Sequence, residues 1–358
     1  MAVYYVLLFV PAMIQHFTIG DHPVDHRRKN QKAIAFFFFL LTLLLILRHE
    51  SVGSDTSNYL YFFKKFSQMS WGDVGNGMLE IGFSYFMKFI SIFTDEPRIF
   101  LAISAITVSA MIYPAYKRLC ADASLTIMLF TIMSTFVVMF SGIRQMLAVG
   151  MGFIAYEFTR RRKPLYFILM VCLAMTFHTS AFMLLFMYPI YHAKITKKWL
   201  YAVVPALIII FMFNSQIFSF LTAIIEQFTS YKGGVSSTGA YTMIIMFGAL
   251  TAFSFLIPDE SLLDEETIGL RNFMLLSLVI QMFAPLHALA MRMSYYYIIF
   301  IPLLIPKIIV NRNARWNQVA VLGRYVMVAF FLAYFFLIKA NSEGNLHVFP
   351  YHFFWENI

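Results

Sequence analysis

The chain has 358 residues, of which 60% are hydrophobic and only 13% are charged. Soluble domains carry roughly a quarter charged residues, so this composition excludes a soluble globular protein. The formal net charge of +9 does not indicate nucleic-acid binding, because no basic cluster is interleaved with stacking aromatic residues in a soluble segment. The apolar runs have the length of helices and alternate too weakly for barrel strands. We therefore expect an all-α polytopic membrane protein.

The apolar runs predict about twelve transmembrane helices in one integral membrane domain, 1–358. The predicted spans are 3–19, 33–47, 98–116, 123–140, 143–158, 164–177, 179–193, 199–220, 240–257, 271–287, 293–310 and 319–338. The first run lacks the basic segment of a cleavable signal and is therefore interpreted as a span. Two outer loops are long, 48–97 with a possible interfacial helix at 79–93, and 221–239.

The basic residues predict which side of the membrane each loop faces. With twelve spans, 18 of the 27 Lys and Arg fall on one side, mostly in short dense loops such as RRRK at 160–163, and 9 fall on the other. The positive-inside rule assigns the basic loops to the cytoplasm. Both termini and the loop 48–97 are therefore expected outside the cytoplasm.

The stretch SGIRQMLAVGMGF at 141–153 indicates an anion site on the outer side. Ser141 is expected to cap a helix that runs inward, so the positive end of its dipole faces outward, and Arg144 adds a full charge there. Free backbone N–H groups and a guanidinium together favour a phosphate or pyrophosphate ligand.

Two further stretches resemble this arrangement. FHTSAF places His178 at the start of a helix that Thr179 or Ser180 is expected to cap, and RMSYYY places Arg292 at the outer end of another span. Spans 143–158 and 164–177 would rise about 24 Å and 21 Å, less than the hydrocarbon thickness near 30 Å. We therefore expect a water-filled inlet open to the outside and lined by Arg144 and His178.

Structural explanations remain open for several of these residues. Arg144 and Arg48 are also compatible with snorkelling to lipid headgroups, and His178 with packing. Asp55 is compatible with simply capping the helix TSNYLYFFKKF. Glu50 and Glu80 are expected to be loop carboxylates without a role. Tyr295 to Tyr297 are expected in the interfacial aromatic belt, with Tyr296 and Tyr297 also candidates for contact with a sugar.

In order and spacing, four motifs resemble the EpsG and Wzy-like polysaccharide polymerases. These motifs are R-x-x-x-x-G-x-D-x-x-x-Y (Arg48, Gly53, Asp55, Tyr59), I-R-Q-x-L-A from Ile143, A-x-x-x-H-x-S-A (Ala174, His178, Ser180, Ala181), and Arg292 followed by a terminal F-P-Y-H-F (349–353). The likeness extends over nearly the whole chain. It implies a plan similar to that of the C-type membrane glycosyltransferases.

The resemblance implies a membrane glycosyltransferase that polymerises lipid-linked oligosaccharide repeat units of O-antigen lipopolysaccharide or exopolysaccharide. It would act on the periplasmic side of the bacterial inner membrane, transferring the growing glycan from polyprenyl pyrophosphate to a hydroxyl of a new repeat unit. Membrane lipids and a chain-length regulator protein are the other expected partners. No D-x-D sequence or His/carboxylate spacing suits a metal, so no metal and no other cofactor is expected.

The predicted roles follow from this chemistry. Pyrophosphate departure needs positive charge, and the acceptor hydroxyl needs a base. The candidates are Arg144, Arg292 and Arg48 for pyrophosphate, His178 and then Asp55 as base, and Gln145, Tyr59, Ser180 and Tyr296 for substrate. A flippase or transporter of lipid-linked oligosaccharide, an O-antigen ligase and an integral-membrane acyltransferase remain alternatives.

Overall fold

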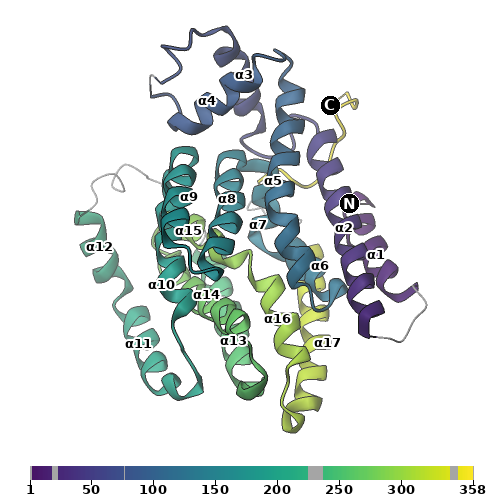
Figure 1. The fold of residues 1–358 in the computed structure, drawn as a ribbon, viewed down its shortest axis with the longest axis vertical. Helices are drawn as coiled ribbons and strands as arrows, with labels where there is room; N and C mark the ends of the chain where they lie inside the picture. Colours follow the sequence, from purple (N-terminus) through teal and green to yellow (C-terminus); the bar gives the residue numbers. More distant parts are fainter. Residues whose placement is uncertain (1, 18–22, 76, 225–236, 339–345, 358) are drawn as a thin grey trace. The chain divides into compact units, whose positions relative to one another are not determined.

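The structure, a computed structural model, describes residues 2–17, 23–75, 77–224, 237–338 and 346–357 (Figure 1). The α-helices are α1 (Ala2–Phe17), α2 (Pro23–Leu47), α3 (Thr56–Gln68), α4 (Ile81–Ile90), α5 (Pro97–Leu119), α6 (Ala123–Ile132), α7 (Ser134–Ser141), α8 (Ile143–Arg160), α9 (Pro164–Phe177), α10 (Met187–His192), α11 (Leu200–Met212), α12 (Asn214–Ile224), α13 (Ser237–Leu256), α14 (Glu265–Gln281), α15 (Ala288–Ile298), α16 (Ile301–Val310) and α17 (Asn317–Ala333). Short 3-10 segments are η1 (Thr179–Phe186), η2 (Lys197–Trp199), η4 (Glu260–Leu262) and η5 (Ala314–Trp316), and η6 (Tyr334–Ile338) is π-helical. β-pairing in these residues is limited to isolated bridges such as Arg48 with Phe353.

The prediction of an all-helical chain is confirmed for the described residues, and each predicted span contains helix. In the part of the chain that the structure describes, three helices are long and apolar enough to cross a membrane by themselves, His26–Leu47, Pro97–Leu119 and Ala314–Ala333. The number rises to six if each of three bent helix pairs is counted as one span. One of these pairs is α6 with the helix that follows it, bent by 59°. The number of twelve spans stays a prediction.

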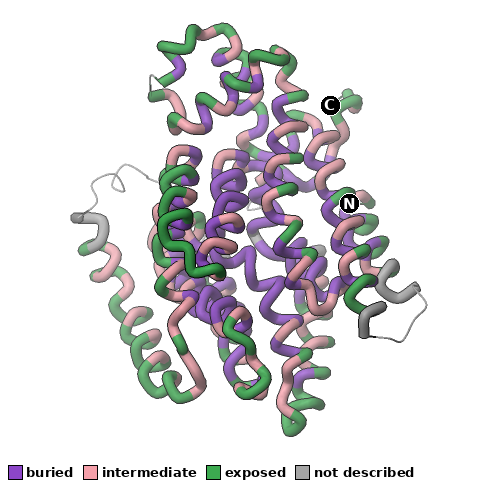
Figure 2. Tube along the Cα trace, in the orientation of Figure 1, coloured by how far each residue is buried: buried purple, intermediate pink, exposed green. Residues whose placement is uncertain are grey.

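Contacts divide the chain into two compact units, which are described separately. The first unit comprises Met1–Leu185 and Tyr325–Ile358, and the second comprises Phe186–Arg324. In the first unit, α2 packs between α1 and α5, α5 packs on α8, and α8 packs on α9 (Figure 1). Figure 2 shows that α8 is buried along most of its length, whereas α9 has exposed stretches.

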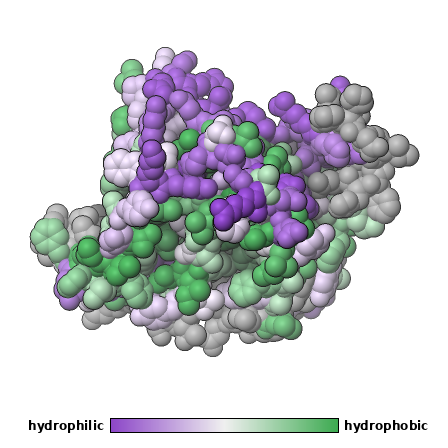
Figure 3. Space-filling model, turned by 90° about the horizontal axis from the view of Figure 1, so that it is seen from below, coloured by the Kyte–Doolittle hydropathy of each residue, from purple (hydrophilic) through white to green (hydrophobic). Residues whose placement is uncertain are grey.

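The exposed face of α9 is apolar, as expected for a surface that meets lipid. Leu165, Leu169 and Leu173 are 66%, 58% and 46% exposed, and their four-residue spacing places them on one helix face. Water would disfavour such a stripe, whereas hydrocarbon would not. Figure 3 likewise shows many hydrophobic side chains at the surface of the molecule. These features fit the expected membrane protein.

The loop 48–97 contains two amphipathic helices, α3 and α4. The buried positions of α3 are Thr56, Tyr59, Phe63 and Phe66, which follow helical spacing. Within the stretch 79–93 the structure has the shorter helix α4, Ile81–Ile90, and the interfacial position of this helix stays a prediction. α3 contacts α4 and α5, and α4 contacts α9, so the two short helices lie at one end of the α5, α8 and α9 group.

The C-terminal segment 346–357 is not helical and packs along the chain after α2. Backbone hydrogen bonds run from Gly53 N to His347 O at 3.2 Å and from Ser54 N to Leu346 O at 2.9 Å. Tyrosine hydroxyls hold the same segment: Tyr4 donates to Val348 O at 2.6 Å, and Tyr351 donates to Leu44 O at 2.7 Å. The F-P-Y-H-F motif therefore packs against the start of the loop 48–97.

In the second unit, α14 contacts α10, α13, α15 and α16. Arg271 of α14 is fully buried and donates to Glu260 Oε1 at 2.6 Å and to Ile195 O at 2.7 Å. A buried guanidinium needs such partners, so Arg271 has a structural role here. Most of the predicted outer loop 221–239 lies outside the described residues.

Candidate functional site

A carboxylate, a guanidinium and an imidazole meet at one end of the first unit. Glu80, directly before α4, receives hydrogen bonds from both Arg144 and His178. Arg144 Nη1 donates to Glu80 Oε2, and His178 Nδ1 lies 3.0 Å from Glu80 Oε1. The three side chains are 27% (Arg144), 18% (Glu80) and 15% (His178) exposed, so the group is partly open to solvent. We call Glu80, Arg144 and His178 the Glu80 cluster.

The hairpin of α8 and α9 explains why Arg144 and His178 are neighbours. Arg144 lies in the first turn of α8, and His178 directly follows the last residue of α9. The two helices pack on each other and are joined by the short turn 161–163. The start of α8 and the end of α9 therefore lie together, whereas the basic residues 160–163 lie at the opposite end.

Tyr59 joins the Glu80 cluster from α3. Its hydroxyl accepts a hydrogen bond from Arg144 Nε at 3.4 Å, and its ring centre lies 5.8 Å from the guanidinium carbon. Tyr59 is only 4% exposed and packs edge-on against Phe83 of α4 at 5.6 Å. Tyr59 therefore binds the Nε side of the Arg144 guanidinium, while Glu80 binds Nη1. The pKa of the Tyr59 hydroxyl is raised, mainly because the side chain is buried.

The charge state of Glu80 decides which His178 nitrogen carries hydrogen. Burial alone would raise the pKa of Glu80, but the hydrogen bond with His178 and the charge of Arg144 outweigh it and lower the pKa to about 2. An ionised carboxylate only accepts hydrogen bonds, so Nδ1 of His178 must be the donor. Nε2 of His178 is then the nitrogen that is left to take a proton from another group.

Arg144 keeps one donor nitrogen for a ligand. Its Nε bonds to Tyr59 and its Nη1 to Glu80, while Nη2 has no hydrogen-bond partner among the residues that the structure describes. Since Arg144 starts α8, the positive end of the helix dipole lies beside this nitrogen. The cluster therefore offers an oriented guanidinium and an oriented imidazole at one place.

Two of the predicted helix caps are wrong. Ser141 is the last residue of α7, and Gly142, which has no side chain to cap a helix, occupies the position before α8. The hydroxyl oxygen of Ser141 lies 2.8 Å from that of Ser54. After His178 the chain continues as the 3-10 segment η1 and not as a capped α-helix. Gln145 and Ser180 are each 5% exposed and adjoin the cluster in sequence. Their substrate contacts stay predictions.

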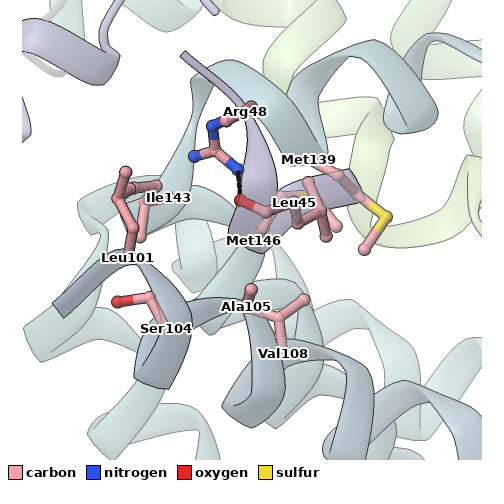
Figure 4. Close-up of a pocket in the computed structure, with 9 residues that line it drawn as sticks. All are labelled: Leu45, Arg48, Leu101, Ser104, Ala105, Val108, Met139, Ile143 and Met146. Carbon is pink, nitrogen blue, oxygen red and sulfur yellow. Dashed lines mark hydrogen bonds between the residues drawn. The ribbon is translucent and has the colours of Figure 1, made fainter. Parts of the chain in front are cut away.

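Arg48 lies buried beside the end of α2. It is 2% exposed, donates from Nη1 to Leu45 O at 2.8 Å, and lies 5.9 Å from the ring centre of Phe140. Figure 4 shows this hydrogen bond and the apolar side chains, such as Leu101 and Ile143, around it. No contact between Arg48 and the Glu80 cluster is found among the described residues. Its predicted role in pyrophosphate binding stays a prediction.

Asp55 occupies the position before α3, but its side chain makes no capping hydrogen bond and accepts instead from Ser54 Oγ at 3.2 Å. It is half-buried, and its role as a second base stays a prediction.

Arg292 and Tyr296 belong to the second unit. There, Arg292 is exposed in the second turn of α15, a helix that starts after His287, and Tyr296 is 1% exposed. Their predicted roles also stay predictions.

The residue that sequence reasoning missed is Glu80. It was expected to have no role, because a single carboxylate between a loop and an apolar stretch has no pattern that marks it. It lies 64 positions from Arg144 and 98 from His178, so only the fold reveals its partners. Within the described residues, no group of three His, Cys, Asp or Glu is arranged to hold a metal.

Comparison with known proteins gives one match. The sequence model of the EpsG family matches residues 32–353, which include the Glu80 cluster and the C-terminal motif. No curated protein and no solved structure matches the chain.

Proposed function

Because the chain belongs to the EpsG family, we propose that it polymerises lipid-linked oligosaccharide repeat units in the bacterial inner membrane. In this proposal the growing glycan is transferred from polyprenyl pyrophosphate to a hydroxyl of a new lipid-linked repeat unit. The reaction takes place at the Glu80 cluster. The observation that carries the proposal is the pairing of one ionised carboxylate with both Arg144 and His178.

Arg144 is the pyrophosphate ligand in this reaction. Negative charge develops on the departing oxygen, and a guanidinium fixed in advance stabilises it without reorganisation. Nη2 binds the diphosphate while Glu80 and Tyr59 keep the other two nitrogens in place. Arg144 stays paired with Glu80 throughout, and this limits the net positive charge at the site. The diphosphate can therefore leave after the transfer.

His178 is the general base. Its Nε2 takes the proton of the acceptor hydroxyl as the oxygen attacks the anomeric carbon of the donor. The bond from that carbon to the pyrophosphate oxygen breaks, and its electron pair leaves with the diphosphate. Glu80 does not touch the reacting atoms. It acts as a positioning residue that fixes the imidazole and stabilises its protonated form.

The α8 and α9 hairpin supports a periplasmic location for this site. Arg160, Arg161, Arg162 and Lys163 lie at the end of the hairpin opposite to Arg144 and His178. Short basic turns of this kind stay in the cytoplasm. α8 has 18 residues and rises about 27 Å, close to the hydrocarbon thickness, so its other end reaches the opposite surface.

Purified protein in liposomes, supplied with the lipid-linked repeat unit, tests the proposal. We expect a ladder of products that each differ by one repeat unit, together with release of polyprenyl pyrophosphate. Movement of the lipid-linked unit between leaflets without new glycosidic bonds would instead identify a transporter. Transfer of a finished glycan to lipid A core, without a ladder, would identify a ligase.

A further inference from the structure

The first unit has a hollow that is separate from the Glu80 cluster. It has a volume of about 490 Å³ and is lined by α3, the start of α5, the chain after α2 and the C-terminal segment. Six of its lining residues carry the argument: Glu50, Tyr61, Lys64, Glu96, Arg98 and Phe354. We call it the α3–α5 cleft. Its volume lies within the range of small-molecule sites, roughly 300–1,000 Å³.

The α3–α5 cleft contains charges of both signs. Glu50 and Glu96 supply carboxylates, and Lys64, Arg98 and the buried Arg48 supply cations. Arg98 feels the charges of both carboxylates, yet no ion pair joins the side chains of Glu50, Glu96, Lys64 and Arg98 in the described structure. An anionic ligand would meet the two carboxylates, and an apolar ligand would have to desolvate all four charges. A neutral ligand with many hydroxyl groups suits this lining best, because each hydroxyl both donates and accepts hydrogen bonds.

Two aromatic rings provide flat surfaces at the same place. Tyr61 is 65% exposed, and Phe354 is 41% exposed with Arg98 stacked 3.8 Å from its ring centre. Aromatic rings combine apolar area with little conformational entropy, so they bind the C–H faces of other rings well. Exposed rings beside hydrogen-bonding charges are what a sugar ring with polar edges and apolar faces requires.

We propose that the α3–α5 cleft is an oligosaccharide-binding site, with Tyr61 and Phe354 stacking on sugar rings and the four charged side chains binding sugar hydroxyls. The proposal rests on the proposed function, since it assigns the cleft to the glycan of the same reaction. α3 joins the two places: Tyr59 on one face contacts Arg144, whereas Tyr61 and Lys64 line the cleft. A glycan held there stays beside the reacting group between successive transfers.

Two measurements test the cleft separately from the chemistry. The first is saturation-transfer NMR of detergent-solubilised protein with the host's repeat-unit oligosaccharide, released from its lipid carrier by mild acid. We expect Tyr61→Ala and Lys64→Ala each to weaken binding about tenfold, which equals about 1.4 kcal/mol. The controls are Tyr201→Ala, an 89% exposed tyrosine outside the cleft, and Lys65→Ala, the exposed neighbour of Lys64. Neither control should change the affinity.

The second measurement is the product length in the liposome assay. Cleft variants should make shorter ladders than the wild-type protein, because the glycan dissociates between transfers. Wild-type affinity and wild-type ladder length in both cleft variants would overturn the proposal that the cleft binds oligosaccharide. A wild-type protein that binds the oligosaccharide through Tyr61 but makes no ladder would leave the cleft standing and overturn the polymerase function instead.

Discussion

His178 Nδ1 donates a hydrogen bond to Glu80 Oε1 at 3.0 Å, although the two residues are 98 positions apart in the chain. The second oxygen of Glu80 binds Arg144. One carboxylate thus orients both the proposed base and the proposed pyrophosphate ligand. A change in any one of the three residues should therefore affect the other two.

Arg144→Ala should abolish the polymer while single repeat units still reach the cell surface. Loss of one fixed donor to a developing anion typically costs 10²–10³ in rate. The measurement is polymer length on gels from cells that carry equal amounts of each variant. Arg161→Ala is the matched control, because its side chain is 58% exposed at the opposite end of the hairpin. Normal polymer from Arg144→Ala would remove this residue from the site.

His178→Gln should lower kcat by about 10²–10⁴-fold, the usual contribution of general base catalysis. His347→Gln is the control, because His347 is exposed on the C-terminal segment and lies outside the Glu80 cluster. Both variants are compared by initial rates of ladder formation with purified protein. Equal activities of the two variants would exclude His178 as the base.

Glu80→Gln should lower the thermal stability of the protein, and the loss of stability should become smaller as the pH falls. The pKa of Glu80 is about 2 in the folded protein, below the ordinary carboxyl value of 4.5. A lowered folded pKa means that the stabilisation is complete above about pH 4.5 and is lost as the pH falls toward 2. The difference in Tm between wild type and variant should stay constant from about pH 5 to pH 8 and shrink below that range. A difference that changes mainly between pH 6 and pH 8 would contradict this assignment.

Gly53→Ala should lower the Tm of the solubilised protein far more than Gly77→Ala. Both glycines have positive φ, +93° and +79°, which is unfavourable for alanine by roughly 1–2 kcal/mol. At Gly53 the added Cβ would also lie 2.2 Å from Phe140 O, whereas at Gly77 no atom lies within 4 Å. Gly53 therefore lets the chain after α2 pack on the end of α7. Equal Tm shifts for the two variants would show that the packing of Gly53 against α7 does not contribute to stability.

Sequence reasoning predicted most helices, because long apolar runs bounded by charge have few other solutions in a membrane. It predicted α9 with the bounds that the structure shows, Pro164–Phe177, since Pro164 and His178 flank an uninterrupted apolar run. It missed the break at Met133, because the residues on either side of the break are as apolar as the helices themselves. Hydropathy contains no information on such a bend.

The site was predicted in part for a similar reason. Arg144 and His178 were identified because cationic groups beside apolar spans are costly and therefore noticeable. Glu80 was not identified, because its importance comes from contacts made by the packing of α4 on α9. Arg48 drew attention as a charge near the membrane surface, yet the fold buries it against Leu45 and Phe140.

In the proposed reaction, Glu80 acts through His178. The most direct test is a double-mutant cycle on the kcat of ladder formation, with Glu80→Gln, His178→Gln and the combined variant. If Glu80 orients the imidazole, the combined variant should lose no more activity than His178→Gln alone. Losses that multiply in the combined variant would mean that the two residues act independently, and would rule out a positioning role of Glu80.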